Sequence, residues 1–397
     1  MKKRQLTLSR RTVLTGGLNA GLSATLLSAS GIASAHQGTS QTPPKLIVII
    51  LRGAMDGLGA VPVIGAGAGG EALRRYRKDL ISARAVPVFE GFALHPALKN
   101  MSRYAASGQA RILHAASGPY RERSHFLAQD LLESGTGRLM TKDGWLNRAL
   151  RNAPSALQAV AIGSATPHIV KGGAPVTSWS PATLPQASED TAARLLKLYE
   201  ADPALESALA QSLALSKTVG DGGGARSGAR AAKGNFVALA TAAGRLIGAA
   251  GGPDIGVLSL TGWDTHVNQV NSLERQLSKL DAALGALETT LGTYWNSALI
   301  TVVTEFGRTV RQNGTLGTDH GTGGAAFVLG GALKGRGLIG DWPGLESSQL
   351  YENRDVFPVN DLRGLFMAAL HQQFGFSYRA LEKTIFPRSS GLPRFTL

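Results

Sequence analysis

Apolar runs and amphipathic segments alternate along the chain. The run KLIVIIL at residues 45–51 is uninterrupted and rich in β-branched side chains, which is typical of a strand buried on both faces of a parallel sheet. Segments with helical periodicity lie between such runs. This alternation predicts an α/β fold with a doubly wound, mainly parallel sheet. The predicted strands are 45–51, 110–117, 156–163, 254–262, 298–305 and 325–331, and the predicted helices are 92–109, 124–135, 191–217 and 270–295.

The first 35 residues differ from the rest. A basic start is followed by a mildly apolar stretch and then by Ala-Ser-Ala before His36, which is the order of an export signal. The Arg10-Arg11 pair resembles a twin-arginine signal. The apolar stretch is too short and too broken by Gly and Asn to span a membrane. We expect a signal peptide at 1–35, recognition by the twin-arginine export machinery, and a periplasmic or otherwise exported product without a stable membrane span.

The amino-acid composition limits the kinds of catalysis and metal binding that the chain can perform. The chain contains no cysteine, which excludes disulfides, thiolate catalysis and Cys-ligated zinc. The full chain has a net charge of +14, and loss of the signal removes five basic residues and no acid, leaving +9. This charge favours anionic ligands. No basic run with interleaved aromatics is present, so we expect no nucleic-acid partner. We expect one α/β domain over 36–397 with a flexible, Gly/Ala/Arg-rich loop at about 217–235.

Polar side chains follow several predicted strands at the point where each strand ends. In sheets of this kind, ligands bind outside the carboxyl ends of the strands. Five separated segments should therefore bring carboxylates, imidazoles and guanidinium groups to one edge. The residues are Asp56, then Ser124 and His125, then Asp264 and His266, then Glu305 and Arg308, and finally Asp319 and His320.

Three interpretations of these residues remain open at the level of sequence: metal ligation, an anion pocket, or ordinary loop hydrogen bonding. Asp264 and His266 form the strongest pair, because Asp-x-His in a loop has little packing value. Arg121 and Arg123 beside Ser124 favour a bound anion. His95 and His114 are predicted to be structural, with His114 inside a strand.

The succession LRGAMDGL, RSHFLAQDLLESG, GWDTH, TEFGR and TDHGTGGAAFVLGGALKG resembles an exported bacterial family known as domain of unknown function 1501. The resemblance covers nearly the whole chain after the signal. It implies membership of the alkaline phosphatase, sulfatase and cofactor-independent phosphoglycerate mutase superfamily. That membership implies an alkaline phosphatase-like α/β core with a metal centre at the strand ends.

The resemblance also implies roles for individual residues. Asp56 stands where the superfamily has its first metal-binding carboxylate. Ser124 stands where a nucleophile opens a helix, with free backbone N–H groups for a phosphoryl or sulfuryl oxygen. Asp264 and His266 correspond to a later metal-binding pair, and His320 corresponds to the final metal-binding histidine.

One position departs from the superfamily pattern. An Asp-His pair is replaced by Glu305-Phe306, and Phe306 cannot bind a metal. A second metal subsite then lacks an imidazole unless His125 or Asp319 supplies the ligand. A site with more carboxylate and less nitrogen shifts from Zn²⁺ towards Ca²⁺, Mg²⁺ or Mn²⁺. We therefore expect a divalent metal, one of Zn, Mn, Ca or Mg, held among Asp56, Asp264, His266, Glu305, Asp319 and His320.

These features predict a metal-dependent hydrolase of phosphate or sulfate esters. Ser124, His125, Arg123 and Arg308 are the expected catalytic residues, and the substrate is an anionic small-molecule or polymer ester. The alternative is a non-catalytic periplasmic binding or assembly protein with a degenerate metal site, which the Phe306 substitution favours.

Overall fold

The computed structural model describes residues 42–180, 189–199, 202, 206, 209–210 and 236–397. The predicted signal segment 1–35 and the predicted loop at 217–235 lie outside the described residues. Within the described part of the chain, no helix is long and apolar enough to cross a membrane.

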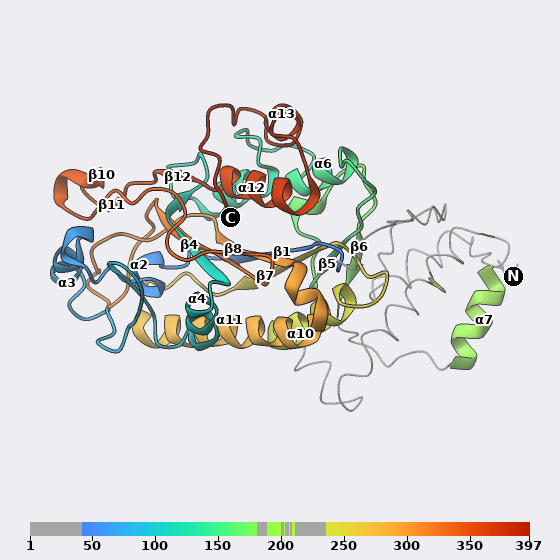
Figure 1. The fold of residues 1–397 in the computed structure, drawn as a ribbon, viewed down its shortest axis with the longest axis horizontal. Helices are drawn as coiled ribbons and strands as arrows, with labels where there is room; N and C mark the ends of the chain where they lie inside the picture. Colours follow the sequence, from blue (N-terminus) through green and yellow to red (C-terminus); the bar gives the residue numbers. More distant parts are fainter. Residues whose placement is uncertain (1–41, 181–188, 200–201, 203–205, 207–208, 211–235) are drawn as a thin grey trace, which may run out of the picture.

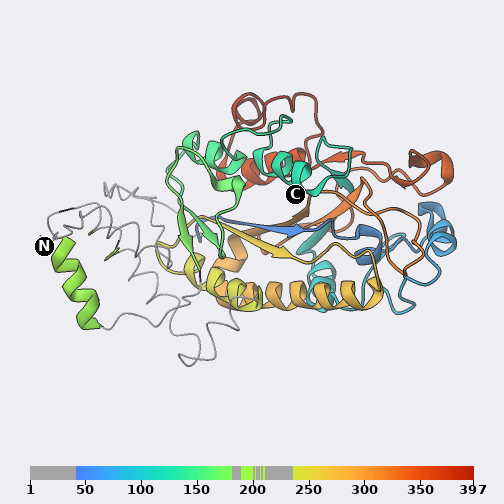
Figure 2. The same ribbon diagram turned by 180° about the vertical axis from the view of Figure 1, so that it is seen from behind.

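An eight-stranded sheet forms the centre of the molecule, and helices pack on both of its faces (Figures 1 and 2). All neighbouring strands are parallel except those that pair with β9, which confirms the predicted mainly parallel sheet. The order across the sheet is β12 (Asn360–Asp361), β4 (Ala110–Ser117), β9 (Gly324–Leu329), β8 (Ala298–Thr304), β1 (Lys45–Arg52), β7 (Ile255–Thr261), β5 (Ala159–Ile162) and β6 (Thr177–Trp179).

The central strand β1 is buried on both faces because its alternating residues enter two separate cores. Ile47, Ile49 and Leu51 belong to one core, which contains the leucines of the long helix α11. Leu46, Val48 and Ile50 belong to the other core, which lies under α12. Helices α4 (Lys99–Ala106), α10 (Phe236–Ile247) and α11 (Gln269–Leu291) cover the first face, and α5 (His125–Ser134), α6 (Trp145–Arg151), α12 (Leu362–Phe374) and α13 (Tyr378–Ala380) lie on the second.

The remaining elements are short. Two small hairpins flank the sheet, and one of them corrects the predicted helix at 92–109: Phe92–Leu94 pairs as a strand, so that the helix begins only at Lys99. The elements are β2 (Val86–Phe89), β3 (Phe92–Leu94), β10 (Leu350–Tyr351), β11 (Asp355–Val356), α2 (Gly57–Ala60), α3 (Gly70–Tyr76), α7 (Glu189–Tyr199), the 3₁₀ helices Ala66–Ala68, His168–Val170, Gly292–Ser297 and Ser347–Gln349, and a π-helical turn at Leu381–Ile385.

The direction of strand β9 determines where the loop between β8 and β9 lies. It runs antiparallel between β8 and β4, so the connection at 305–323 leaves and re-enters the sheet at the same edge. The carboxyl ends of β1, β4, β7 and β8 lie at that edge as well. Helix α5 begins there, after Ser124 in extended conformation, and ends at Gly135 with φ 66°, as its sequence predicted.

His114 is a structural histidine, as predicted. It lies buried in β4, where Nε2–H donates to the Val61 carbonyl at 3.1 Å and Nδ1 accepts from the Ala115 N–H at 2.9 Å. Both contacts require the neutral ring. Burial lowers the pKa of His114 from 6.5 to about 4.

This histidine predicts a pH dependence of stability. Between pH 6.5 and about 4 the unfolded chain binds a proton at His114 that the folded chain does not, so the free energy of unfolding should fall as the pH falls. The full loss is roughly 3 kcal/mol at 1.36 kcal/mol per unit. Urea unfolding of wild type and His114→Gln over this pH range measures it. Equal slopes in the two proteins would contradict the assignment.

Candidate metal centre

Three loops deliver polar side chains to the edge where the parallel strands end. Asp264 and His266 follow β7, and His125 is the first residue of α5, which follows β4. His320 lies in the loop between β8 and β9. The predicted convergence at the carboxyl ends of the strands is therefore present for these four residues.

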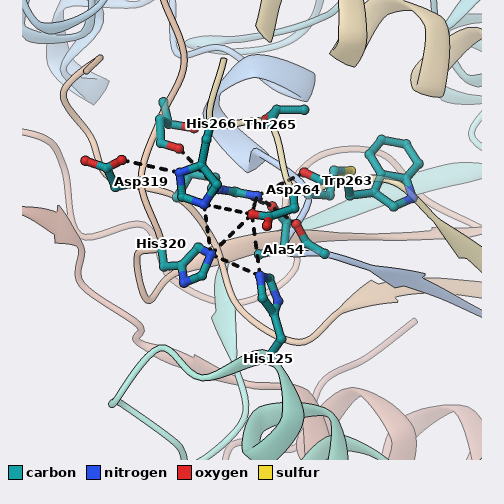
Figure 3. A network of polar contacts seen from close by, with 12 residues as sticks. Ala54, His125, Trp263, Asp264, Thr265, His266, Asp319 and His320 are labelled. Atoms are coloured by element: carbon teal, nitrogen blue, oxygen red, sulfur yellow. Dashed lines mark hydrogen bonds and ion pairs between the residues drawn. The ribbon is translucent and has the colours of Figure 1, made fainter. Parts of the chain in front are cut away.

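Three imidazoles and one carboxylate meet at a single point (Figure 3). His320 Nε2 lies 3.0 Å from both His125 Nε2 and His266 Nε2. Asp264 Oδ1 lies 3.0 Å from His266 Nε2, 3.2 Å from His320 Nε2 and 3.5 Å from His125 Nε2. Among the described residues, His125, Asp264 and His320 form a group of mutually close atoms suited to a metal ion, and His266 adjoins it.

The other nitrogen of each ring faces an acceptor. His125 Nδ1 lies 2.8 Å from Glu305 Oε1, His320 Nδ1 lies 3.0 Å from the Arg123 carbonyl oxygen, and His266 Nδ1 lies 3.4 Å from Asp319 Oδ1. Carboxylates and carbonyls only accept, so in a neutral ring that donates to such a partner Nδ1 carries the proton and Nε2 is the acceptor. Metal-binding histidines are oriented by partners of this kind.

This tautomer leaves the Nε2 atoms with lone pairs that face one another. Neutral rings cannot hydrogen-bond to each other in that arrangement, and a cation between them removes the conflict. A tetrahedral zinc ion with bonds of about 2 Å places its ligand atoms about 3.3 Å apart. The separations of 3.0–3.5 Å among His125 Nε2, Asp264 Oδ1 and His320 Nε2 fit three ligands of such an ion.

The pKa values of the clustered residues are shifted in different directions. The hydrogen bond to Glu305 raises the pKa of His125, whereas burial and the charges of His125 and Arg308 lower the pKa of His320. Burial alone would raise the pKa of Asp264, but the charge and hydrogen bond of Arg308 outweigh it and lower that pKa. At neutral pH the cluster therefore contains an ionised carboxylate and at least one neutral imidazole.

Glu305 was predicted to bind the metal directly, but in the structure its carboxylate contacts the Nδ1 side of His125, away from the Nε2 atoms. Its side chain is fully buried, and Oε1 accepts from the Gly53 N–H, His125 Nδ1 and Gln129 Nε2 at 2.8–2.9 Å. Burial opposes ionisation, but the hydrogen bonds from His125 and Gln129 lower the pKa of Glu305. Asp319 likewise contacts the Nδ1 side of His266. The Asn313 amide holds it and lowers its pKa.

Phe306, the departure from the expected pattern, supports the imidazoles. Its ring stacks on His125 with centroids 4.8 Å apart, and it lies 5.4 Å from the His320 ring. The missing imidazole is supplied by His125 from another loop. The site is therefore richer in nitrogen than the sequence indicated.

Arg308 was predicted to hold substrate oxygens, and its surroundings contradict this. The side chain is fully buried and donates to four backbone carbonyl oxygens and to Asp264. Those contacts occupy the Nε–H, both N–H groups of Nη2 and one N–H of Nη1, and Nη1 also lies 3.4 Å from His266 Nε2, so the guanidinium is directed at protein acceptors. Arg308 instead fixes the strand ends around the cluster. The carbonyls belong to Gly53, Ala54, Trp263 and Thr318.

Arg123 and Ser124 lie beside the cluster without belonging to it. The Arg123 guanidinium pairs with Asp355 at 2.8 Å and with Glu352, while its carbonyl oxygen holds His320. Ser124 precedes His125 at the start of α5, is half-buried, and makes no capping hydrogen bond with its side chain.

Asp56 is not brought into the metal group. Its carboxylate is buried and forms a bidentate ion pair with Arg77, at 2.5 and 2.9 Å, and accepts from Gln269 Nε2 at 2.6 Å. These donors occupy both oxygens. The predicted role of Asp56 as a metal ligand therefore does not fit the structure.

Asp56 instead organises the loops that carry the ligands. Gln269 Oε1 accepts from Thr265 Oγ1 at 2.9 Å and from Thr318 Oγ1 at 2.6 Å. Thr265 lies between Asp264 and His266, and Thr318 lies two residues before His320. The buried network thus ties two ligand loops to one carboxylate.

Sequence reasoning missed Arg77, Gln129 and Gln269. Arg77 lies in a polar helix end and carries no motif. Gln129 could have been found, because it stands one turn after His125 on the same face of α5 and reaches the same carboxylate.

Comparisons with solved structures give low scores. Alkaline phosphatase from the Antarctic bacterium TAB5 is 12% identical, with 75% of this chain and 95% of that chain covered and a TM-score of 0.37. Phosphonate monoester hydrolase of Agrobacterium radiobacter is 12% identical, with coverage of 84% and 74% and a TM-score of 0.40. PsFucS1 sulfatase from Pseudoalteromonas sp. is 13% identical, with coverage of 84% and 68% and a TM-score of 0.38. With TM-scores below 0.5, these similarities support no conclusion about activity.

No curated protein matches the chain. A family model does match, over residues 111–385, which include His125, Asp264, His266 and His320. The matched range is more than half of the chain. The protein therefore belongs to the family described as Protein of unknown function (DUF1501).

Proposed function

We propose that the protein is a metal-dependent hydrolase of anionic esters, with phosphate and sulfate esters as the substrate class. The observation that carries the proposal is the convergence of three imidazole Nε2 atoms on Asp264, each ring held at Nδ1 by an acceptor. The side chains of His125, His266 and His320 are 27–39% exposed. A substrate can therefore reach these three imidazoles from solvent.

His125, Asp264, His266 and His320 would hold a divalent ion. The cluster contains the carboxylates of Asp264, Glu305 and Asp319 and the guanidinium of Arg308, which pairs with Asp264. With neutral imidazoles it carries two net negative charges, which a divalent ion balances. Three imidazoles and one carboxylate favour Zn²⁺ or Mn²⁺ over Ca²⁺ and Mg²⁺, which prefer oxygen ligands.

A divalent ion in this position polarises an ester oxygen and lowers the pKa of a bound hydroxyl or water. The chain supplies the remaining functions. Glu305 keeps the proton on His125 Nδ1 and so keeps the Nε2 lone pair directed at the centre. Ser124 offers a hydroxyl at the start of α5 next to His125, where the positive helix end favours an anion.

Hydrolysis of 4-nitrophenyl phosphate and 4-nitrophenyl sulfate by protein loaded with Zn²⁺ or Mn²⁺ tests the proposal. If Ser124 is the nucleophile, Ser124→Ala should reduce turnover by at least about 100-fold while metal content stays unchanged, because the Ser124 side chain makes no capping hydrogen bond whose loss would destabilise α5. Undiminished turnover in Ser124→Ala would assign the attack to water. Absence of turnover in wild type with both metals would reject the hydrolase.

A non-catalytic binding or assembly role is the second candidate. It is favoured by the engagement of Arg123 and Arg308 with protein acceptors, which leaves neither guanidinium committed to a substrate anion. Metal binding without turnover of any ester would support it.

We also propose that the protein is exported by the twin-arginine route, on the strength of Arg10-Arg11 and the Ala-Ser-Ala end of the leading segment. Replacing both arginines with lysine should leave the precursor in the cytoplasm. Cell fractionation and immunoblotting measure this. Unchanged processed protein in the periplasm would contradict the proposal.

A further inference from the structure

Exposed apolar side chains gather beside the metal centre. Nine large apolar residues are exposed among the described residues, and four of them form two groups that each adjoin a ligand histidine. Single exposed apolar residues are ordinary, but grouped ones mark binding surfaces. The first group is Phe126 and Met140, and the second is Val267 and Leu316.

The first group is joined through α5. Phe126 directly follows the ligand His125, and Asp130 stands one turn later on the same face of the helix. The Asp130 carboxylate accepts from the Met140 N–H at 2.7 Å, which brings Met140 over that face. Phe126 is 74% exposed and Met140 is 82% exposed.

The second group is joined through backbone hydrogen bonds. Val267 directly follows the ligand His266. The next two residues donate to the neighbouring loop: Asn268 N–H to the Thr315 carbonyl at 3.2 Å, and Gln269 N–H to the Leu316 carbonyl at 2.8 Å. Leu316 therefore lies beside Val267, and the two are 52% and 62% exposed.

We propose that one of these two apolar groups binds the alcohol portion of the substrate, which is a phosphate or sulfate ester of a long-chain alkyl alcohol. The proposal rests on the hydrolase function proposed above. The groups flank the open metal centre, so an ester whose anionic end meets the imidazoles places its chain against one of them. Water then cleaves the ester to inorganic phosphate or sulfate and the free alcohol, whose oxygen takes a proton.

Chain length tests the inference. Burial of each methylene group strengthens binding by about fourfold, so metal-loaded wild type should have a kcat/KM for octyl phosphate at least about 100-fold above that for methyl phosphate. Phe126→Ser tests the first group and Val267→Ser tests the second. The variant in the group that binds the alkyl chain should lower the ratio of kcat/KM for octyl phosphate to that for methyl phosphate by about tenfold. Leu198→Ser is the matched control, because Leu198 on α7 is 71% exposed and adjoins no ligand histidine; its ratio should equal that of wild type.

The outcomes separate this inference from the proposed function. Equal use of both esters, or a ratio that neither variant changes, overturns the apolar site while the hydrolase stands. Absence of turnover rejects the hydrolase. The calorimetric affinities of the metal-loaded protein for octyl and methyl phosphate are then compared, and equal affinities, or a difference that neither variant changes, overturn the apolar site. Variants that change only the oligomeric state in sedimentation would assign the surface to a second copy of the chain and overturn it.

Discussion

Replacing His320 with alanine should weaken the binding of Zn²⁺ or Mn²⁺ by more than about 100-fold. His320 Nε2 is the atom that lies within 3.2 Å of His125, His266 and Asp264 alike. The outer partners of ligand histidines already contribute 10- to 100-fold to metal affinity, so that loss of the ligand itself should cost more. Isothermal titration of chelator-treated protein measures the change.

A matched control for His320→Ala is available within the chain. His371 is exposed on α12, where Nδ1 lies 2.8 Å from the Phe376 carbonyl oxygen, and it is far from the ligand loops in sequence. His371→Ala should bind metal as wild type does. Wild type should also gain about 2.7 kcal/mol of stability at a free metal concentration of 100 times its Kd, and at the same concentration His320→Ala should gain less than about 0.4 kcal/mol. Equal affinity in the two variants would show that His320 is not a ligand.

Replacing Arg77 with methionine should destabilise the protein by about 3–5 kcal/mol, because it leaves the Asp56 carboxylate buried without its counter-charge. Both side chains have 1% exposure or less. Arg77 also donates to the carbonyl oxygens of Thr309 and Val310, at 2.6 and 2.8 Å, so the loop that carries Arg308 should loosen as well. Urea unfolding measures the loss.

The double variant Asp56→Asn, Arg77→Met separates the ion pair from the packing. Removing the unpaired charge should recover part of the stability lost in Arg77→Met. A cost below about 1 kcal/mol for Arg77→Met alone would contradict the buried ion pair. In both variants metal affinity should fall, because Asp56 holds Gln269 and through it the ligand loops.

The fold could be predicted from apolar runs because strands buried on both faces have an unmistakable composition. Residues 45–51 lie in β1, and the strand predicted at 298–305 is β8, which ends at Thr304; both are at the centre of the sheet. The helix predicted at 92–109 failed at its start, where Phe92–Leu94 pairs with the preceding strand. A short strand of that kind depends on a partner that local periodicity does not reveal.

The candidate site could be predicted in part, for a physical reason. Residues at the ends of parallel strands share one edge, so that Asp264, His266 and His320 were expected together. Which carboxylate faces a metal and which holds a histidine depends on side-chain reach and on buried partners. No sequence motif predicts that Arg77 forms an ion pair with Asp56. Glu305 hydrogen-bonds to His125, which itself faces the centre of the site.

The central claim is that His125, Asp264, His266 and His320 form one divalent-metal site. Calorimetric titration of chelator-treated wild type with Zn²⁺ and Mn²⁺ tests it most directly. The geometry predicts one tightly bound ion per chain, with release of protons on binding at pH values where histidines are partly protonated. A wild-type protein that binds neither ion would contradict the claim.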